Sequence, residues 1–592
     1  MTFRFHGARL VCVAIVATVL AACSREQAPA APPTPAPDPH AAVQAAWTQF
    51  AARFIEDYFK LDPMFAVQSG RHEFDGQMTD FSADGIAKNV AWLKKARAEA
   101  AGFDTAALTT DQGFERDYVL HVIDRDLFWM DRARFPFTNP AWYTDQLDPD
   151  VYLNRDYAPL DKRMKGYIGY ARAIPQAVAD IRANLKMPIP RSLLERGIDA
   201  FGGYAEFYRN DVAQVFASVQ DPEAQKDLAT ADTAAAKAMG ELKSWLVSQR
   251  KSATDAFALG APLFQEMLQA TESVNVPVAD LLSIGQADLE RNTQALKDAC
   301  AKYLPKGTLR ACVEKMNANK PKGGAVDGAR AQLAELRAFI VAKNIVTIPG
   351  DEQALVAEAP PYARGNSAYI NVPGPYDKGV ASTYEIAPPD PSWSAKERAE
   401  YIPGVADLLF TTVHEVWPGH FLQFQYSNRN PSRIAALWVG YAYAEGWAHY
   451  CEEMMWDEGF GNGDPETHVG QLQNALLRDV RFVSAIGLHT QGMTLAQSEK
   501  LFRDSSFSDP GNSRQQAARG TYDPAYLGYT LGKLMIRKLR DDWVAKQPGA
   551  TGLTPADQMK YWQAFHDKFL SYGGPPIPLA RKYMLGEGGS LF

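Results

Sequence analysis

Apolar residues recur at intervals of three and four along most of this chain, a spacing that places them on one face of an α-helix. The pattern is clear in residues 42–59, which carry Trp47, Phe50, Phe54 and Tyr58 at this spacing. Five further stretches repeat it: residues 114–132, 160–185, 193–215, 231–247 and 328–343. The sequence therefore predicts a mainly α-helical fold.

Short runs of strand-forming residues interrupt the helical pattern after residue 344, with proline and glycine between them. These runs are residues 345–348, 354–357, 368–372 and 382–386. They predict a small β-sheet directly before the segment with the most reactive residues. The last run is a candidate to pair with the backbone of an extended substrate.

The folded part of the chain is too long for one hydrophobic core. Roughly 550 residues follow the N-terminal segment, and a single core stops growing at about 250–300 residues. We therefore predict an N-terminal helical lobe over residues 42–330. Residues 331–592 would form a second lobe, with the small sheet, further helices and a deep cleft.

The first 22 residues have the parts of a secretory signal peptide. Arg4 and Arg9 are followed by an apolar run, and small residues precede Cys23. A cysteine in this place resembles the bacterial lipobox, where it is acylated and becomes the first residue of the mature chain. The other interpretation is an ordinary signal peptide with an incidental cysteine. A membrane-spanning helix needs a longer run of about 20 apolar residues.

Residues 23–41 are rich in alanine and proline, which is typical of an extended spacer. We expect it to hold the folded body away from the membrane, with lipid on Cys23 as the membrane contact. By resemblance to enterobacterial sorting rules, Ser24 favours the outer membrane, facing the periplasm. The net charge of −8 without a basic run argues against a nucleic-acid partner.

Three cysteines remain beyond the N-terminal segment. Cys300 and Cys312 lie close together in the sequence of an exported protein, where disulfides form readily. We therefore expect a disulfide between them. Cys451 lies among apolar residues at helical spacing, which indicates a buried thiol.

The segment with the clearest chemistry contains His414, Glu415 and His420. In HExxH zinc peptidases, two histidines on one helix bind the metal, and the glutamate after the first accepts a proton from the attacking water. Five of the ten histidines lie between His414 and His489. The pattern predicts Zn²⁺ bound by the two histidines, with Glu415 as the general base.

The spacing of the two histidines requires a break in their helix. Residues six apart in a regular α-helix point about 120° away from each other. Pro418 cannot donate a hydrogen bond to the carbonyl of His414, and Gly419 permits backbone dihedrals that other residues avoid. We therefore predict that helical bonding lapses near Pro418, which brings His420 back to the metal.

A third ligand is expected from the helical pattern of residues 441–458. Glu445 lies 25 residues after His420, at the edge of an apolar helix face. A buried carboxylate needs a metal or a partner, so Glu445 is either the third ligand or half of a salt bridge. His449 and Glu452 follow on the same side. They either orient the ligands or form a solvated polar stripe.

Three short motifs carry a resemblance to a known family. His-Glu-Val-Trp-Pro-Gly-His at 414–420, Glu-Gly-Trp-Ala at 445–448 and Tyr-Thr-Leu-Gly at 529–532 resemble the bacterial domain of unknown function 885 family, which is grouped with gluzincin-type metallopeptidases. The resemblance implies a helical, metal-dependent peptidase-like fold. It also implies His414, His420 and Glu445 as ligands and Glu415 as the base.

Hydrolysis of a peptide also needs a group that stabilises the developing oxyanion. The family resemblance favours Tyr529, beside Gly528 and Gly532; its other interpretation is a core tyrosine. Three further candidates are Tyr522, Tyr526 and His489. An arginine is also expected to bind a substrate carboxylate or to be structural; the candidates are Arg478, Arg481 and Arg519.

Together these features predict a zinc-dependent peptidase that acts on peptides in the bacterial envelope. Two alternatives use the same residues. One is an envelope lipoprotein in which the metal is only structural, although such a site does not need Glu415. The other is an amidase that acts on cell-wall peptides.

Overall fold

The computed structural model describes residues 39–359, 364, 367–586 and 589–592. The predicted signal peptide, the acylation site Cys23 and the spacer up to residue 38 lie outside the described residues. Within the described part of the chain, no helix is both long enough and apolar enough to cross a membrane.

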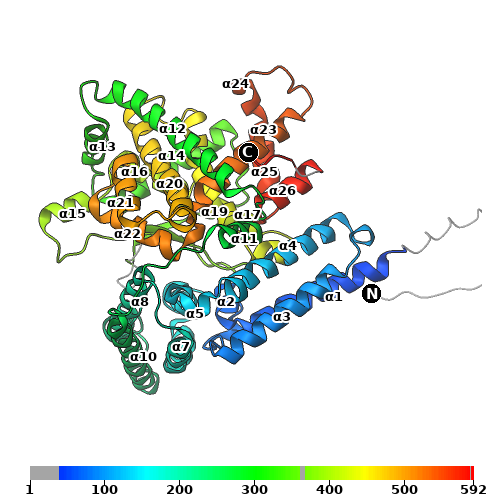
Figure 1. Ribbon diagram of the computed structural model, residues 1–592, viewed down its shortest axis with the longest axis vertical. Helices are drawn as coiled ribbons and strands as arrows, with labels where there is room; N and C mark the ends of the chain where they lie inside the picture. Colours follow the sequence, from blue (N-terminus) through cyan, green and yellow to red (C-terminus); the bar gives the residue numbers. More distant parts are fainter. Residues whose placement is uncertain (1–38, 360–363, 365–366, 587–588) are drawn as a thin grey trace, which may run out of the picture.

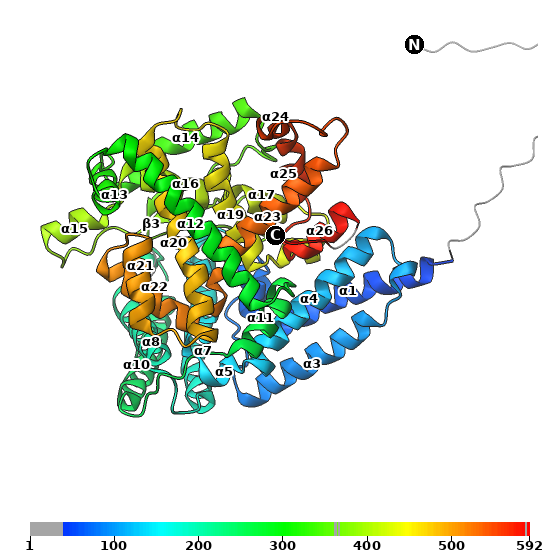
Figure 2. The same cartoon turned by 45° about the horizontal axis from the view of Figure 1, so that its top comes forward.

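Three long helices near the N-terminus lie side by side (Figures 1 and 2). They are α1 (Ala41–Leu61), α3 (Ala83–Ala101) and α4 (Thr110–Leu127). The apolar face predicted for the first helix is buried here, with Trp47, Phe50 and Phe54 in a shared core. Trp438 packs into the same core from a distant part of the sequence, so this group is joined to the body of the protein.

A second group of helices has a core of its own. It is built on α7 (Leu160–Asn184), α8 (Arg191–Asn210) and α10 (Pro222–Gln249). Short helices lie within and between these two groups: α2 (Pro63–Gln68), α5 (Phe135–Thr138), α6 (Asp150–Asn154) and α9 (Val212–Val215). The predicted helical stretches in both groups are confirmed. Most ends are shifted by a few residues, but α10 begins nine residues before the predicted start.

The largest core belongs to the remaining helices (Figure 1). Before the sheet they are α11 (Ala261–Glu272), α12 (Val278–Tyr303), α13 (Leu309–Ala318) and α14 (Ala325–Lys343). After it come α15 (Ala395–Tyr401), α16 (Val405–Glu415), α17 (His420–Asn428), α18 (Arg433–Leu437), α19 (Tyr441–Asp457), α20 (Pro465–Thr490), α21 (Leu495–Ser505), α22 (Pro510–Tyr522), α23 (Gly528–Ala545), α24 (Pro555–Gln558), α25 (Trp562–Leu570) and α26 (Ile577–Leu585). Residues from both sides of the predicted boundary at residue 330 share this core, so that boundary stays a prediction.

A three-stranded sheet lies beside α16, as β2 contacts that helix. Its strands are β1 (Leu355–Glu358), β2 (Ala368–Asn371) and β3 (Thr383–Ile386). β3 runs parallel to β1 and antiparallel to β2. The mainly α fold with a small sheet is therefore confirmed, while the deep cleft stays a prediction.

Two expectations about the strands are wrong. Residues 345–348 form no strand, because side chains of α25 take the backbone groups that a ladder would need: His566 Nδ1 lies 2.7 Å from the carbonyl oxygen of Ile345, and the Thr347 amide donates to Asp567 Oδ1 at 2.8 Å. The strand at 382–386 cannot pair with a substrate backbone either. It is the central strand, and β1 and β2 occupy both of its edges.

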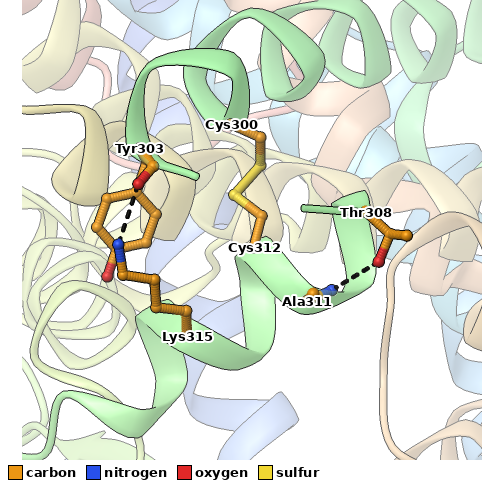
Figure 3. Close-up of a disulfide and its surroundings, with 6 residues drawn as sticks. All are labelled: Cys300, Tyr303, Thr308, Ala311, Cys312 and Lys315. Carbon is orange, nitrogen blue, oxygen red and sulfur yellow. Dashed lines mark hydrogen bonds between the residues drawn. A yellow bond between two sulfur atoms is a disulfide. The ribbon is translucent and has the colours of Figure 1, made fainter. Parts of the chain in front are cut away.

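The predicted disulfide between Cys300 and Cys312 is confirmed and joins α12 to α13 (Figure 3). Two further interactions hold the same turn. The Thr308 hydroxyl accepts a hydrogen bond from the Ala311 amide at 3.1 Å and caps α13. Lys315 Nζ donates to the carbonyl oxygen of Tyr303 at 3.0 Å. Cys451 is a buried free thiol, as expected.

Candidate metal centre

The helix that carries the two histidines is broken between them. α16 ends at Glu415 and α17 begins at His420. The last regular bond runs from the Val416 amide to the Thr412 carbonyl at 2.9 Å, and Pro418 has no amide hydrogen to donate. Regular bonding resumes after the break, so the predicted interruption is confirmed.

Gly419 is required at this break because of close packing. A Cβ atom at this position would lie 1.8 Å from the carbonyl oxygen of His414. The φ angle of Gly419 is −71°, so the requirement is one of space and not of left-handed backbone. The Gly419 amide donates to the Val413 carbonyl at 3.0 Å and closes the bulge.

Helix α19 fixes the break from outside. The indole nitrogen of Trp447 donates to the carbonyl oxygen of Pro418 at 2.9 Å. Trp447 lies two residues after Glu445, so the same turn of α19 holds the bulge and presents the third predicted ligand. This contact joins the motif at residues 414–420 to the motif at residues 445–448.

The three predicted ligands come together at this point. Glu445 Oε2 lies 3.2 Å from His414 Nε2 and 3.4 Å from His420 Nε2. One atom from each residue lies within 4.8 Å of the other two, and no other group of this kind occurs among the described residues. Two imidazoles and one carboxylate form a ligand set that suits Zn²⁺ and leaves a fourth position for water or substrate.

Glu452 holds the other side of the His414 ring. Its Oε1 lies 2.7 Å from His414 Nδ1 and 3.1 Å from a terminal nitrogen of Arg478. A carboxylate on Nδ1 fixes the tautomer and aims Nε2 at the metal position. Glu452 and His449 are completely buried, so the alternative of a solvated polar stripe is wrong.

Burial and pairing set the charges of the site. Burial opposes protonation of His414, but the hydrogen bonds to Glu445 and Glu452 outweigh it and raise its pKa to about 9. Burial would raise the pKa of Glu445, but its two histidine partners hold it well below the ordinary value. Burial raises the pKa of Glu415 against the pull of both histidines. A raised pKa brings a carboxylate closer to that of a general base for neutral pH.

Tyr529 lies against the candidate metal centre. Its ring centroid is 6.1 Å from that of His414, and its ring also lies beside the guanidinium of Arg519. Two glycines allow this approach, because α23 touches α19 there. A Cβ at Gly532 would lie 2.0 Å from the carbonyl oxygen of Ala442, and one at Gly446 would lie 2.4 Å from Gly532 Cα.

The other three candidates for the oxyanion have different surroundings. His489 Nε2 lies 2.7 Å from the carbonyl oxygen of Gly520, and its Nδ1 accepts from a backbone amide at 3.2 Å, so both ring nitrogens are used structurally. Tyr526 is completely buried in the largest core. The ring of Tyr522 lies under the guanidinium of Arg196.

All three candidate arginines surround Tyr529. The guanidinium carbons of Arg478, Arg481 and Arg519 lie 6.0, 4.7 and 5.9 Å from its ring centroid. Sequence reasoning missed Tyr441, whose hydroxyl accepts from Arg519 Nη2 at 2.9 Å. Its position one helical turn before Glu445 is the signal that could have found it.

Tyr441 also lines a cavity that the sequence did not predict. The cavity has a volume of about 190 Å³. Its lining is Arg125, Trp129, Thr271, Glu272, Tyr441, Asp523 and Ala525. These residues come from distant parts of the chain, so no local sequence pattern could have indicated the cavity.

Comparisons with known proteins place this site in a wider context. The model of a family described as bacterial protein of unknown function (DUF885) matches residues 63–584. A structure of a candidate lipoprotein of unknown function from Shewanella oneidensis is similar, with 26% identity, a TM-score of 0.74 and coverage of 91% of this chain and 99% of that one. A candidate lipoprotein from Colwellia psychrerythraea has the same fold at 18% identity, with a TM-score of 0.75 and coverage of 92% and 98%. No curated protein matches the chain.

Proposed function

The chain belongs to the DUF885 family of bacterial proteins, and from the site that its fold assembles we propose that it is a zinc-dependent peptidase of the bacterial envelope. The observation that carries the proposal is the convergence of His414, His420 and Glu445, with Glu415 directly beside the first ligand. The proposal extends to gluzincin-like chemistry, in which Glu415 acts on water and not on the metal.

The ligand atoms fit the proposed metal. Tetrahedral ligands at zinc bond lengths of about 2.0–2.1 Å are separated by about 3–4 Å. The Glu445 carboxylate oxygen lies 3.2 and 3.4 Å from the two histidine nitrogens, and all three ligand atoms lie within 4.8 Å of one another. When bound, zinc supplies a Lewis acid that polarises a carbonyl and acidifies water. Structural zinc sites usually have four protein ligands, whereas three converge here among the described residues.

The residues around the metal position have separate roles in the proposed hydrolysis. Glu415 accepts the proton of the attacking water and returns it to the leaving amine. Tyr529 donates its hydroxyl hydrogen to the carbonyl oxygen as negative charge develops there. Glu452 acts through His414, because it fixes the orientation of that ring.

The proposed location rests on the N-terminal segment. A lipid on Cys23 would anchor the protein, and the 26% identical Shewanella relative is itself described as a candidate lipoprotein. Ser24 favours the outer membrane with the folded body in the periplasm. The substrates would then be peptides of that compartment.

The proposal is tested with purified mature protein after zinc loading. We expect one zinc per chain and metal-dependent cleavage of a diverse peptide library, detected by mass spectrometry and abolished by a chelator. Glu415→Gln should keep the zinc and lower kcat by about 10²–10⁴-fold. The exposed Glu314→Gln serves as the matched control and should change nothing. Wild-type turnover by Glu415→Gln, or no stoichiometric metal after zinc loading, would refute the proposal.

A further inference from the structure

The three arginines around Tyr529 differ in what neutralises them. Arg478 lies 3.1 Å from the Glu452 carboxylate, and Arg519 Nε donates to Asp523 Oδ2 at 3.0 Å. Arg481 has no carboxylate partner among the described residues, and it donates only from Nε, to the amide oxygen of Gln516 at 2.8 Å. Its two terminal nitrogens are therefore free to bind a ligand.

The surroundings of Arg481 favour an anion. The side chain is only 8% exposed, and a buried cation without a counter-ion is unfavourable. Burial lowers its pKa, and the neighbouring charges of Arg519 and Arg478 add to this effect. An incoming anion would replace the missing counter-ion, and the planar fork of the guanidinium matches a carboxylate with two parallel hydrogen bonds.

Arg481 lies close to the candidate metal centre. Its guanidinium carbon is 4.7 Å from the centroid of Tyr529, and that centroid is 6.1 Å from the ring of His414. The two distances together equal the length of about three extended residues. A carboxylate held by Arg481 would therefore belong to a group within a few residues of the bond at the metal.

We propose that Arg481 binds the C-terminal α-carboxylate of the peptide substrate, so that the protein removes one to a few residues from the C-terminal end of peptides. This inference rests on the proposed peptidase function. The reaction consumes one water and breaks one amide C–N bond. It leaves a new carboxylate on the shortened peptide and a free amine on the released fragment.

A carboxylate can also come from an acidic side chain, and matched peptides separate the two sources. We compare one sequence with a free C-terminus, the same sequence as a C-terminal amide, and the amide with an internal glutamate. We expect kcat/KM for the free acid to exceed that for the plain amide by about 10–100-fold, the usual effect of a hydrogen-bonded charge. Rescue of the amide by the internal glutamate would overturn the assignment to the C-terminus.

Variants test the assignment to Arg481. Arg481→Gln should remove the preference for the free acid, and Arg481→Lys should keep part of it, because charge remains but the fork is lost. The exposed Arg514→Gln on α22 is the matched control and should keep the full preference. Equal preference in wild type and Arg481→Gln would overturn the inference.

A binding measurement separates this inference from the peptidase proposal. In zinc-loaded Glu415→Gln, a fluorescent free-acid peptide should bind about 10–100-fold more tightly than its amide, and the added Arg481→Gln change should abolish the difference. Absence of cleavage by the wild type with this binding preference intact would refute only the peptidase function. Cleavage without any preference would refute only the role of Arg481. If Arg481→Gln does not fold, the peptide series on the wild type and on Arg481→Lys decides the question.

Discussion

Two clusters of charged side chains contain consecutive residues of α19, Glu452 and Glu453. They differ in how many of their polar atoms have hydrogen-bond partners. The Glu452 cluster contains His414, His449, Glu452 and Arg478. The Glu453 cluster contains Asp288, Arg291, Glu453, Asp479, Lys533 and Arg537. The carboxylates of both clusters are buried, whereas Arg291 and Arg537 of the Glu453 cluster are 42% and 30% exposed, so we compare the clusters through their buried polar atoms.

The Glu453 cluster satisfies its polar atoms. Lys533 is completely buried, and its Nζ lies 2.6 Å from Asp288 and 3.6 Å from Glu453. Asn292 and Thr530 donate to the two oxygens of Asp479 at 2.6 and 2.9 Å. Buried networks of this kind hold elements together, and this one joins α12, α19, α20 and α23.

The Glu452 cluster leaves polar atoms without partners. Nε2 of His449 and Nε of Arg478 are buried without a hydrogen bond, and His449 Nδ1 faces Glu452 Oε2 at 3.5 Å without hydrogen-bond geometry. Each such group is unfavourable for stability. Since unpaired buried groups often mark functional sites, the comparison supports the proposed functional role for the side of α19 that faces His414 and a structural role for the side that faces Lys533.

The largest expected effect tests the structural role of the Glu453 cluster. Lys533→Met should lower the free energy of unfolding by about 3–5 kcal/mol, because it leaves buried carboxylates without their cation. Zinc affinity should not change, because Lys533 contacts no metal ligand. Urea denaturation and zinc titration measure the two quantities. A loss of zinc affinity in the folded variant would show that the clusters are not separate.

The next effect concerns Tyr529, which lies beside the candidate metal centre. Tyr529→Phe should lower kcat by about 10²-fold with little change in KM, because the hydroxyl acts only on the developing oxyanion. Tyr526→Phe is the matched control, since that ring is buried in the core. Steady-state kinetics on one peptide measure both variants. If Tyr526→Phe caused the loss and Tyr529→Phe did not, the role of Tyr529 would be wrong.

A smaller effect separates the two neighbouring glutamates directly. Glu452→Gln should weaken zinc binding by about 10–100-fold, because His414 loses the carboxylate that orients it. Glu453→Gln, one residue further along the helix, should leave zinc affinity unchanged. Competition with a chelator of known affinity gives both values. Equal losses in the two variants would remove the distinction between the clusters.

Sequence reasoning predicted the features that are determined by residues close together in the chain. The lack of an amide hydrogen at Pro418 predicts the helix break, and the spacing from His420 predicts the position of Glu445. It failed where the cause is the packing of distant segments. The central place of β3 in the sheet depends on two other strands. The lack of a carboxylate partner at Arg481 depends on the pairing of Glu452 with Arg478 and of Asp523 with Arg519. The choice between an orienting Glu452 and a solvated stripe likewise required the burial that α20 provides.

The smallest effect is the pH dependence of the stability that the Glu453 cluster contributes. Burial raises the pKa of Glu453, but Lys533, Arg537 and Arg291 outweigh burial and lower it to about 2. A carboxyl whose folded pKa is depressed stabilises the protein above its unfolded pKa, and this contribution is lost as the pH falls through the folded pKa. The stability difference between wild type and Glu453→Gln should therefore be largest at pH 7 and should shrink by about 1 kcal/mol or more at pH 3. Urea denaturation of both proteins across this range measures it, and the subtraction cancels the titration of all other carboxylates. A difference that stayed constant down to pH 2 would mean that Glu453 is not held ionised by its three cations, and the contrast with Glu452 would then rest on hydrogen bonding alone.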